Sequence, residues 1–80
     1  MYILEGLEMK ENSAHYLTLK RLNVLKLMAK GLRNKEIAYQ LGLSESTVKQ
    51  HVSAMMRQLN ADTRTAVVVT AQKLGLIDKE

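Results

Sequence analysis

The chain contains no proline, and glycine occurs only four times among its 80 residues. Proline and glycine are the strongest local breakers of regular structure, so a chain this poor in them favours helices joined by short turns. The three aromatic residues are all tyrosines, although 46% of the residues are hydrophobic. We therefore expect one small all-α domain with an aliphatic core. The absence of cysteine excludes disulfides and thiolate metal sites.

Apolar residues recur at spacings of three and four in four segments, a pattern typical of helices with one buried face. The predicted helices span about residues 19–30, 35–41, 45–59 and 64–74. The first three are preceded by residues of types that cap helix N-termini, namely Thr18, Asn34 and Ser44. The inner stripe of the fourth helix is expected to contain Val67, Thr70, Ala71 and Leu74. The domain is expected to span residues 17–77, with a tail or linker at 1–16 and a C-terminal tail at 78–80.

Only residues 42–44 separate the second and third predicted helices. A glycine-containing turn of three to four residues between two helices is typical of a helix-turn-helix unit. The second helix of such a unit enters the DNA major groove, where its outward side chains meet base edges. In this chain those side chains are Lys49, Gln50 and Ser53, all capable of hydrogen bonding and none acidic. Lysine can donate to guanine, and glutamine can pair with adenine.

The positive charge of the chain is concentrated in its middle. Residues 17–57 contain eight basic and two acidic residues, whereas residues 1–16 contain one basic and three acidic residues. A concentrated basic excess is typical of a polyanion binder, although a solvated lysine-rich surface gives the same pattern. An apolar span of 18 residues is absent, and no basic start precedes an apolar run. Neither a membrane span nor a secretory signal is expected, so the expected location is the cytoplasm.

Three short motifs give the helix-turn-helix pattern a family resemblance. They are the run NKEIA at 34–38, the segment SESTVKQH at 44–51 and the closing LGLI at 74–77. With them, residues 17–77 resemble the LuxR-type (LuxR/FixJ) DNA-binding domain. The resemblance implies four helices, the third of which reads DNA while the fourth commonly forms a homodimer contact. It assigns base reading to Lys49, Gln50 and Ser53. It also matches positions that hold the DNA backbone or brace the helices: Asn34, Lys35, Ser44, Thr47, Arg57 and Arg64.

The first helix departs from the family pattern. Arg21 stands where the family has a glutamate, so Thr18 lacks its capping-box partner and a cation lies near the positive end of the helix. We expect this change to weaken the first turn by roughly 0.5–1 kcal/mol. The change also adds a positive charge that could face a phosphate. Gln58 and Ala66 also depart from the family, where lysine and glutamate are common. His51, at the edge of the apolar stripe, is expected to pack or to form a hydrogen bond.

The fourth predicted helix carries apolar residues outside its inner stripe. Val68 and Val69 point away from that stripe, and a small monomer has no evident reason to expose them. We assign Val68, Val69 and Gln72 to a homodimer interface. A dimer is expected to bind two half-sites related by two-fold symmetry and separated by about one helical turn of DNA.

Catalysis and metal binding are not expected. The chain has two histidines, no cysteine and no glycine-rich phosphate loop, which leaves no set for nucleophilic or metal chemistry. We expect no cofactor and no small-molecule ligand. The expected function is sequence-specific binding of double-stranded DNA by a bacterial transcription regulator, freestanding or as the C-terminal domain of a response regulator.

Two alternative functions remain open. One is a sigma-factor-like promoter-reading module, which makes RNA polymerase a candidate partner. The Arg64-Thr65 helix after the reading helix favours the LuxR type instead. The other is a protein–protein interaction module whose basic face meets an acidic partner, which strong salt-dependent DNA binding would exclude.

Overall fold

The computed structural model describes residues 17–78, which form four α-helices and no strand. The helices are α2 (Leu19–Ala29), α3 (Asn34–Leu41), α4 (Glu45–Gln58) and α5 (Arg64–Lys73). The all-α, four-helix prediction is confirmed, and every predicted boundary lies within one residue of the observed one. The predicted tail or linker at 1–16 and the last two residues of the predicted C-terminal tail lie outside the described residues.

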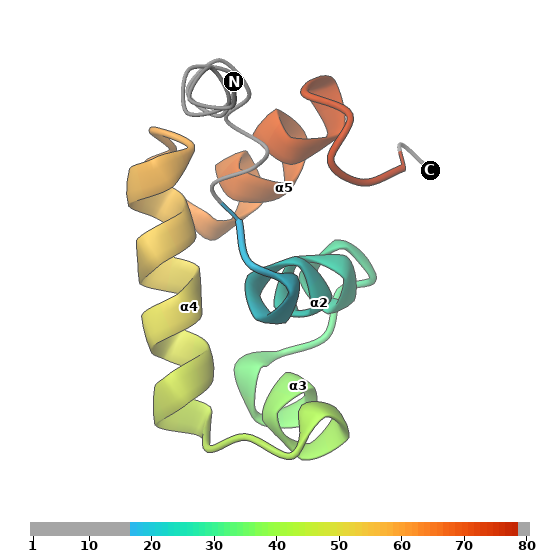
Figure 1. The fold of residues 1–80 in the computed structure, drawn as a ribbon, viewed down its shortest axis with the longest axis vertical. Coiled ribbons are helices and arrows are strands. Elements are labelled where there is room, and N and C mark those ends of the chain that lie inside the picture. The colour runs from blue at the N-terminus through green and yellow to red at the C-terminus, as the bar shows by residue number, and fades with distance from the viewer. Residues whose placement is uncertain (1–16, 79–80) are drawn as a thin grey trace, which may run out of the picture.

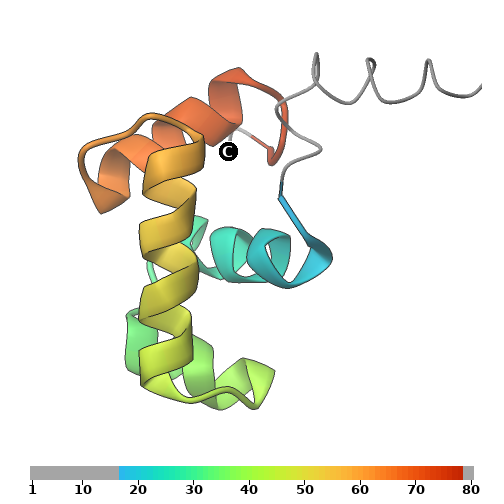
Figure 2. The same cartoon turned by 60° about the vertical axis from the view of Figure 1, so that its left-hand side comes forward.

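The longest helix, α4, organises the arrangement of the other three. It runs along one side of the domain, with α3 at one end, α2 near its middle and α5 at the other end (Figure 1). A second view shows the same order along α4 (Figure 2). All three shorter helices contact α4, so one face of α4 is buried along its length and the opposite face remains open.

Side-chain caps fix the starts of three helices. The hydroxyl of Thr18 accepts a hydrogen bond from the backbone N–H of Arg21 at 3.1 Å. Ser44 caps α4 in the same way, and Thr63 caps α5 by accepting from the backbone N–H of Ala66 at 3.0 Å. Each cap satisfies one of the backbone donors that a helix N-terminus leaves without an intrahelical partner.

The start of α3 differs from the sequence prediction. The prediction that Asn34 is the N-cap is wrong, because the helix includes Asn34 and its N-cap is Arg33. The carboxylate of Glu36 accepts the backbone N–H of Arg33 at 2.7 Å, which stabilises this helix start. The side chain of Asn34 instead accepts a hydrogen bond from Arg64 at the start of α5.

The turn between α3 and α4 depends on the backbone of Gly42. This residue has φ 69°, and the next N–H, that of Leu43, reaches back to the carbonyl of Ala38 at 2.9 Å. A Cβ at position 42 would meet no atom within 4 Å. Glycine is therefore favoured by the left-handed backbone conformation and not by lack of space.

The core is aliphatic, as expected, and the described residues include no buried polar side chain. Its fully buried large side chains come from all four helices: Val24, Leu25, Ile37, Val48, Met55 and Val67. The prediction that Leu74 joins this core is wrong, because Leu74 is 50% exposed. The helix ends at Lys73 and the chain reverses at Gly75, with φ 77°. The partly buried Leu76 and Ile77 pack against the core after this reversal.

Candidate nucleic-acid interface

The open face of α4 brings the three predicted base-reading residues together. Lys49, Gln50 and Ser53 are exposed, and with Arg57 they line one shallow depression on the helix surface. At 3.6 residues per turn, these four side chains leave the helix axis within about 100° of one another. The opposite face is fixed by burial of the apolar stripe. The result is an exposed helix face to which these four residues contribute two cations and two neutral hydrogen-bonding groups.

Two residues on this surface were missed by the sequence prediction. Glu45 and Ser46 line the same depression and are exposed in the first turn of α4. The spacing of four residues from Glu45 to Lys49 and from Lys49 to Ser53 was the available signal. Glu45 is the acidic member of this face. A carboxylate in the first turn of a helix is stabilised by the positive end of the helix dipole.

Ser44 and Thr47 hold the start of α4 through their hydroxyl groups. The Ser44 Oγ accepts from the backbone N–H of Thr47 at 3.0 Å and donates to the Thr47 Oγ1 at 2.9 Å. The two hydroxyls therefore fix each other where the helix enters the open face. Contact of either residue with the DNA backbone stays a prediction.

Arg64 joins the start of α5 to the start of α3. Its Nη1 donates to the Oδ1 of Asn34 at 2.6 Å, and its Nη2 donates to the carbonyl oxygen of Leu32 at 2.9 Å. A guanidinium carries five N–H donors, so three remain for other acceptors. The two bonds make Arg64 and Asn34 a brace between helices, and their contact with DNA stays a prediction.

A basic hollow lies beside this brace. It is lined by the exposed side chains of Arg33 and Lys35, by Arg64, and by Glu45 of α4. The hollow therefore adjoins the open face of α4 on the side of α3 and α5. Lys35 was a predicted backbone contact, whereas Arg33 was missed; the signal was a basic residue directly before the NKEIA run.

On the other side of the open face, Arg21 joins α2 to α4. Its Nε donates to the Nδ1 of His51 at 3.2 Å, and its Nη1 donates to the Oε1 of Gln58 at 3.4 Å. The acceptor role of Nδ1 places the proton of the neutral imidazole on Nε2. The expectation that His51 packs or forms a hydrogen bond is confirmed. Burial, and then the charges of Arg21 and Lys20, lower the pKa of His51 below its usual 6.5.

This environment makes the stability of the domain depend on pH. Because folding lowers the pKa of His51 below 6.5, the unfolded chain takes up this proton first as the pH falls. The contribution of His51 to the free energy of unfolding is therefore fully present above pH 6.5. It is lost as the pH falls toward the pKa that His51 has in the folded domain. Denaturant unfolding on both sides of pH 6.5 should show this loss. A His51→Gln variant should lose less stability over the same range, and an equally steep loss in the variant would contradict the assignment.

The predicted dimer residues differ in their exposure on α5. Val69 is 43% exposed, whereas Val68 is half-buried and packs partly against the core. Gln72 is half-buried, and its Nε2 donates to the backbone carbonyl of Asp78 at 3.5 Å. Val69 is thus the one of the three that presents most apolar surface outward.

Most of the chain matches a known protein family. Residues 15–71 match the family model described as "Bacterial regulatory proteins, luxR family". The chain belongs to the LuxR family of bacterial regulatory proteins. The resemblance noted in the sequence is confirmed, and this LuxR-family domain is a DNA-binding helix-turn-helix domain of transcription regulators. Because the family consists of such regulators, the domain is not an enzyme.

Individual relatives agree with this assignment. The LuxR-family domain is 51% identical over 69% of its length to the "Glycerol metabolism activator" of Pseudomonas putida, covering 25% of that protein. It is 41% identical over 85% of its length to the "Transcriptional regulatory protein YdfI" of Bacillus subtilis (strain 168), covering 32% of it. Over 74% of its length it is 41% identical to the "Nitrate/nitrite response regulator protein NarL" of Escherichia coli (strain K12), covering 27% of it. The chain therefore spans between a quarter and a third of these relatives.

Within residues 17–78, no group of three or more His, Asp or Glu side chains is placed to hold a metal ion. None of the helices described is long and apolar enough to cross a membrane.

Proposed function

We propose that this LuxR-family domain binds double-stranded DNA in a sequence-specific manner, with α4 in the major groove. The observation that carries the proposal is the exposure of Lys49, Gln50 and Ser53 on one face of α4, opposite its buried face. The major groove, about 12 Å wide, admits an α-helix. Lysine and glutamine carry donors for the acceptors that guanine and adenine present there.

Affinity and sequence choice come from different side chains in this proposal. Cations beside the groove displace counterions from the phosphates, which gives affinity for any sequence. Lys49, Gln50 and Ser53 contact base edges and select the sequence. The proposed backbone group lies around α4: Asn34, Lys35, Ser44, Thr47, Arg57 and Arg64. Two bonds already hold the guanidinium of Arg64, so it approaches a phosphate as a fixed donor.

The domain acts as a homodimer in this proposal. One copy offers few base contacts, and the exposed Val69 on α5, with Val68 and Gln72 beside it, supports contact between two copies through this helix. Two copies related by two-fold symmetry would bind two half-sites separated by about one turn of DNA. The protein would regulate transcription in the bacterial cytoplasm, where RNA polymerase is a candidate partner. The name of the relative NarL, a "Nitrate/nitrite response regulator protein", supports a role as a response regulator.

Selection from a randomised pool of DNA duplexes, repeated at two salt concentrations, tests this function. We expect enrichment of a two-fold symmetric site whose halves lie about one helical turn apart. Binding without enrichment would contradict base reading by α4 and leave only electrostatic attraction. No binding at low salt would overturn the DNA proposal in favour of an acidic protein partner.

Replacement of Lys35 by alanine is expected to weaken binding to all DNA sequences alike. Lys35 is exposed and lines the basic hollow beside α4, and the proposal assigns it a phosphate contact and no base contact. The slope of log affinity against log salt should become shallower by about one. Titrations of the selected site and of an unrelated duplex at several salt concentrations would measure both effects. A loss confined to the selected site would show that Lys35 reads sequence instead.

A further inference from the structure

The two sides of the open α4 face carry different sets of cations. A helix in the major groove lies between two phosphate strands, so each side of α4 faces one strand. On the side of Glu45 lies the hollow with Arg33, Lys35 and Arg64. On the opposite side, beyond Gln50, lie His51 and the guanidinium of Arg21. None of the residues that the family resemblance assigns to DNA-backbone contacts lies on α2. A cation from α2 on this second side is therefore not part of that assignment.

Arg21 is fixed along the second side of α4 by its two hydrogen bonds. His51 and Gln58, which accept them, are seven residues or about two helical turns apart, so the guanidinium lies between these two side chains. Because a guanidinium has five N–H donors, three remain after these two bonds. The position is set by α4 itself, so Arg21 moves with the helix that enters the groove.

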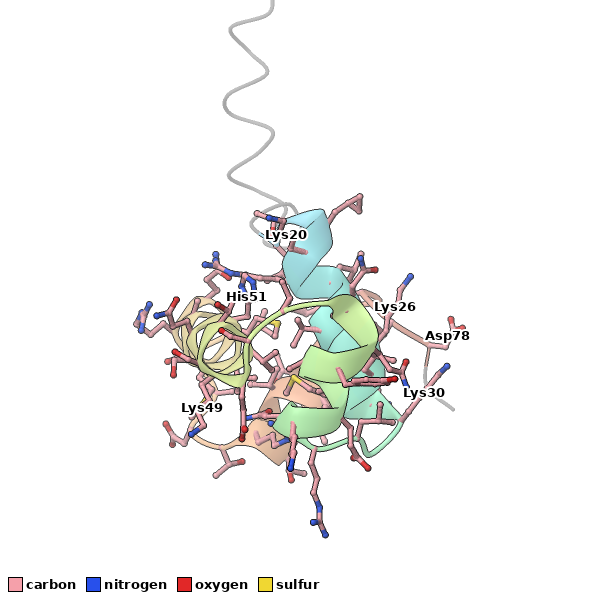
Figure 3. All side chains as sticks on the ribbon, turned by 90° about the horizontal axis from the view of Figure 1, so that it is seen from below. Lys20, Lys26, Lys30, Lys49, His51 and Asp78 are labelled. Atoms are coloured by element: carbon pink, nitrogen blue, oxygen red, sulfur yellow. The ribbon has the colours of Figure 1, made fainter. Side chains whose placement is uncertain are left out.

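Lys20 adds a second cation at the same place. It is exposed next to Arg21 in the first turn of α2, and its charge contributes to lowering the pKa of His51. Figure 3, seen from the α3 end, shows Lys20 and His51 close together, whereas Lys26 and Lys30 lie across α2, away from α4. Lys20 therefore lies at the N-terminal end of α2, on the side of His51, whereas Lys26 lies on the side of this helix away from α4 (Figure 3).

We propose that Lys20 and Arg21 together bind the phosphate backbone of the second DNA strand, so that α4 is held in the groove from both sides. This inference rests on the proposed function of the domain. The contact by Arg21 goes with the departure from the family pattern noted in the sequence, which has a glutamate at this position, and a carboxylate there would repel a phosphate. The acceptors would be phosphate oxygens, so the contact would add affinity without sequence choice.

The experiment is a salt titration of DNA binding by single variants of the full chain. Lys20→Ala should make the slope of log affinity against log salt shallower by about one, equally for the selected site and an unrelated duplex. Lys26→Ala, which removes an exposed lysine from the far side of the same helix, should leave the slope unchanged. An unchanged slope for Lys20→Ala, or an equal change for Lys26→Ala, would overturn the inference.

A second pair of variants tests the charge of Arg21. Both substitutions alter its hydrogen bonds to α4, but only one of them removes the charge. Arg21→Lys keeps the charge and should keep the slope, whereas Arg21→Gln removes the charge and should make the slope shallower by about one. Thermal unfolding of each variant checks that it is folded. Equal slopes for the two variants would contradict a phosphate contact by Arg21.

The His51 ring, which accepts a hydrogen bond from Arg21, provides a second readout. A phosphate bound beside these two cations would offset their charge, so the pKa of His51 should rise when DNA is added. Titration of the imidazole NMR signals with and without the selected duplex would show this rise. A pKa unchanged by DNA would overturn the inference.

The same titrations separate this inference from the proposed function. If Lys35→Ala makes the slope shallower and Lys20→Ala does not, DNA binding stands and the second phosphate contact is refuted. If the unmodified chain binds no DNA, both proposals fall together.

Discussion

Replacement of Lys49 by alanine should lower the affinity for the selected DNA site by about 1–3 kcal/mol, roughly 5- to 150-fold. Lys49 is exposed on the open α4 face, one turn before Ser53 and two turns before Arg57. Its ammonium group can donate to guanine acceptors in the major groove. Truncation removes that donor and leaves the base acceptor facing a gap, so the preference at that base pair should also relax.

The measurement is equilibrium binding to the selected duplex and to a set in which each base pair is changed in turn. The matched control is Lys26→Ala, which removes the same charge from an exposed site away from α4. The control should keep both the affinity and the base preference. A Lys49→Ala variant with unchanged preference at every position would remove Lys49 from the base-reading group.

Replacement of Leu25 by alanine should lower the free energy of unfolding by about 2–5 kcal/mol. Leu25 is fully buried and belongs to the one core cluster that all four helices share. The change removes apolar contacts and leaves a cavity. Small domains have only about 5–15 kcal/mol of stability or less, so the variant should be partly unfolded and should bind DNA weakly for that reason.

Denaturant unfolding followed by circular dichroism would measure this loss. Leu19→Ala is the matched control, because it makes the same substitution in the same helix at a side chain that is 70% exposed. Surface substitutions usually change stability by no more than about 0.5 kcal/mol. Equal losses in the two variants would mean that α2 does not pack through Leu25 as described.

Local patterns were enough to predict most of the fold. The spacing of Val48, Val52 and Met55 identifies the buried face of α4, and all three are buried. The glycine at position 42 predicts the turn, because its left-handed conformation is one that other residues rarely adopt. Once the buried face of α4 and its turn are known, the exposed positions of Lys49, Gln50 and Ser53 follow from helix geometry.

The two errors lie at helix ends, where contacts outside the helix decide the position of a side chain. Asn34 is a good N-cap by type, but its Oδ1 accepts from Arg64, 30 residues later. Leu74 fits the apolar spacing of α5, but the helix ends one residue earlier and Leu76 and Ile77 pack against the core after the turn. The bond from Arg21 to His51 also spans 30 residues. Helical periodicity reports neighbours three and four residues apart, so it carries no signal for such contacts.

The guanidinium of Arg64 ties the first residue of α5 to the segment that opens α3. A rotation of α5 would therefore also rotate α3 and α4, which form the helix-turn-helix unit. If two copies meet through α5, the distance between their two α4 helices depends on how α5 packs within each domain and not on a flexible connection. Such a pair would hold its two α4 helices at a fixed distance and orientation. It would therefore discriminate DNA sites by the length and the twist of the DNA between the two half-sites.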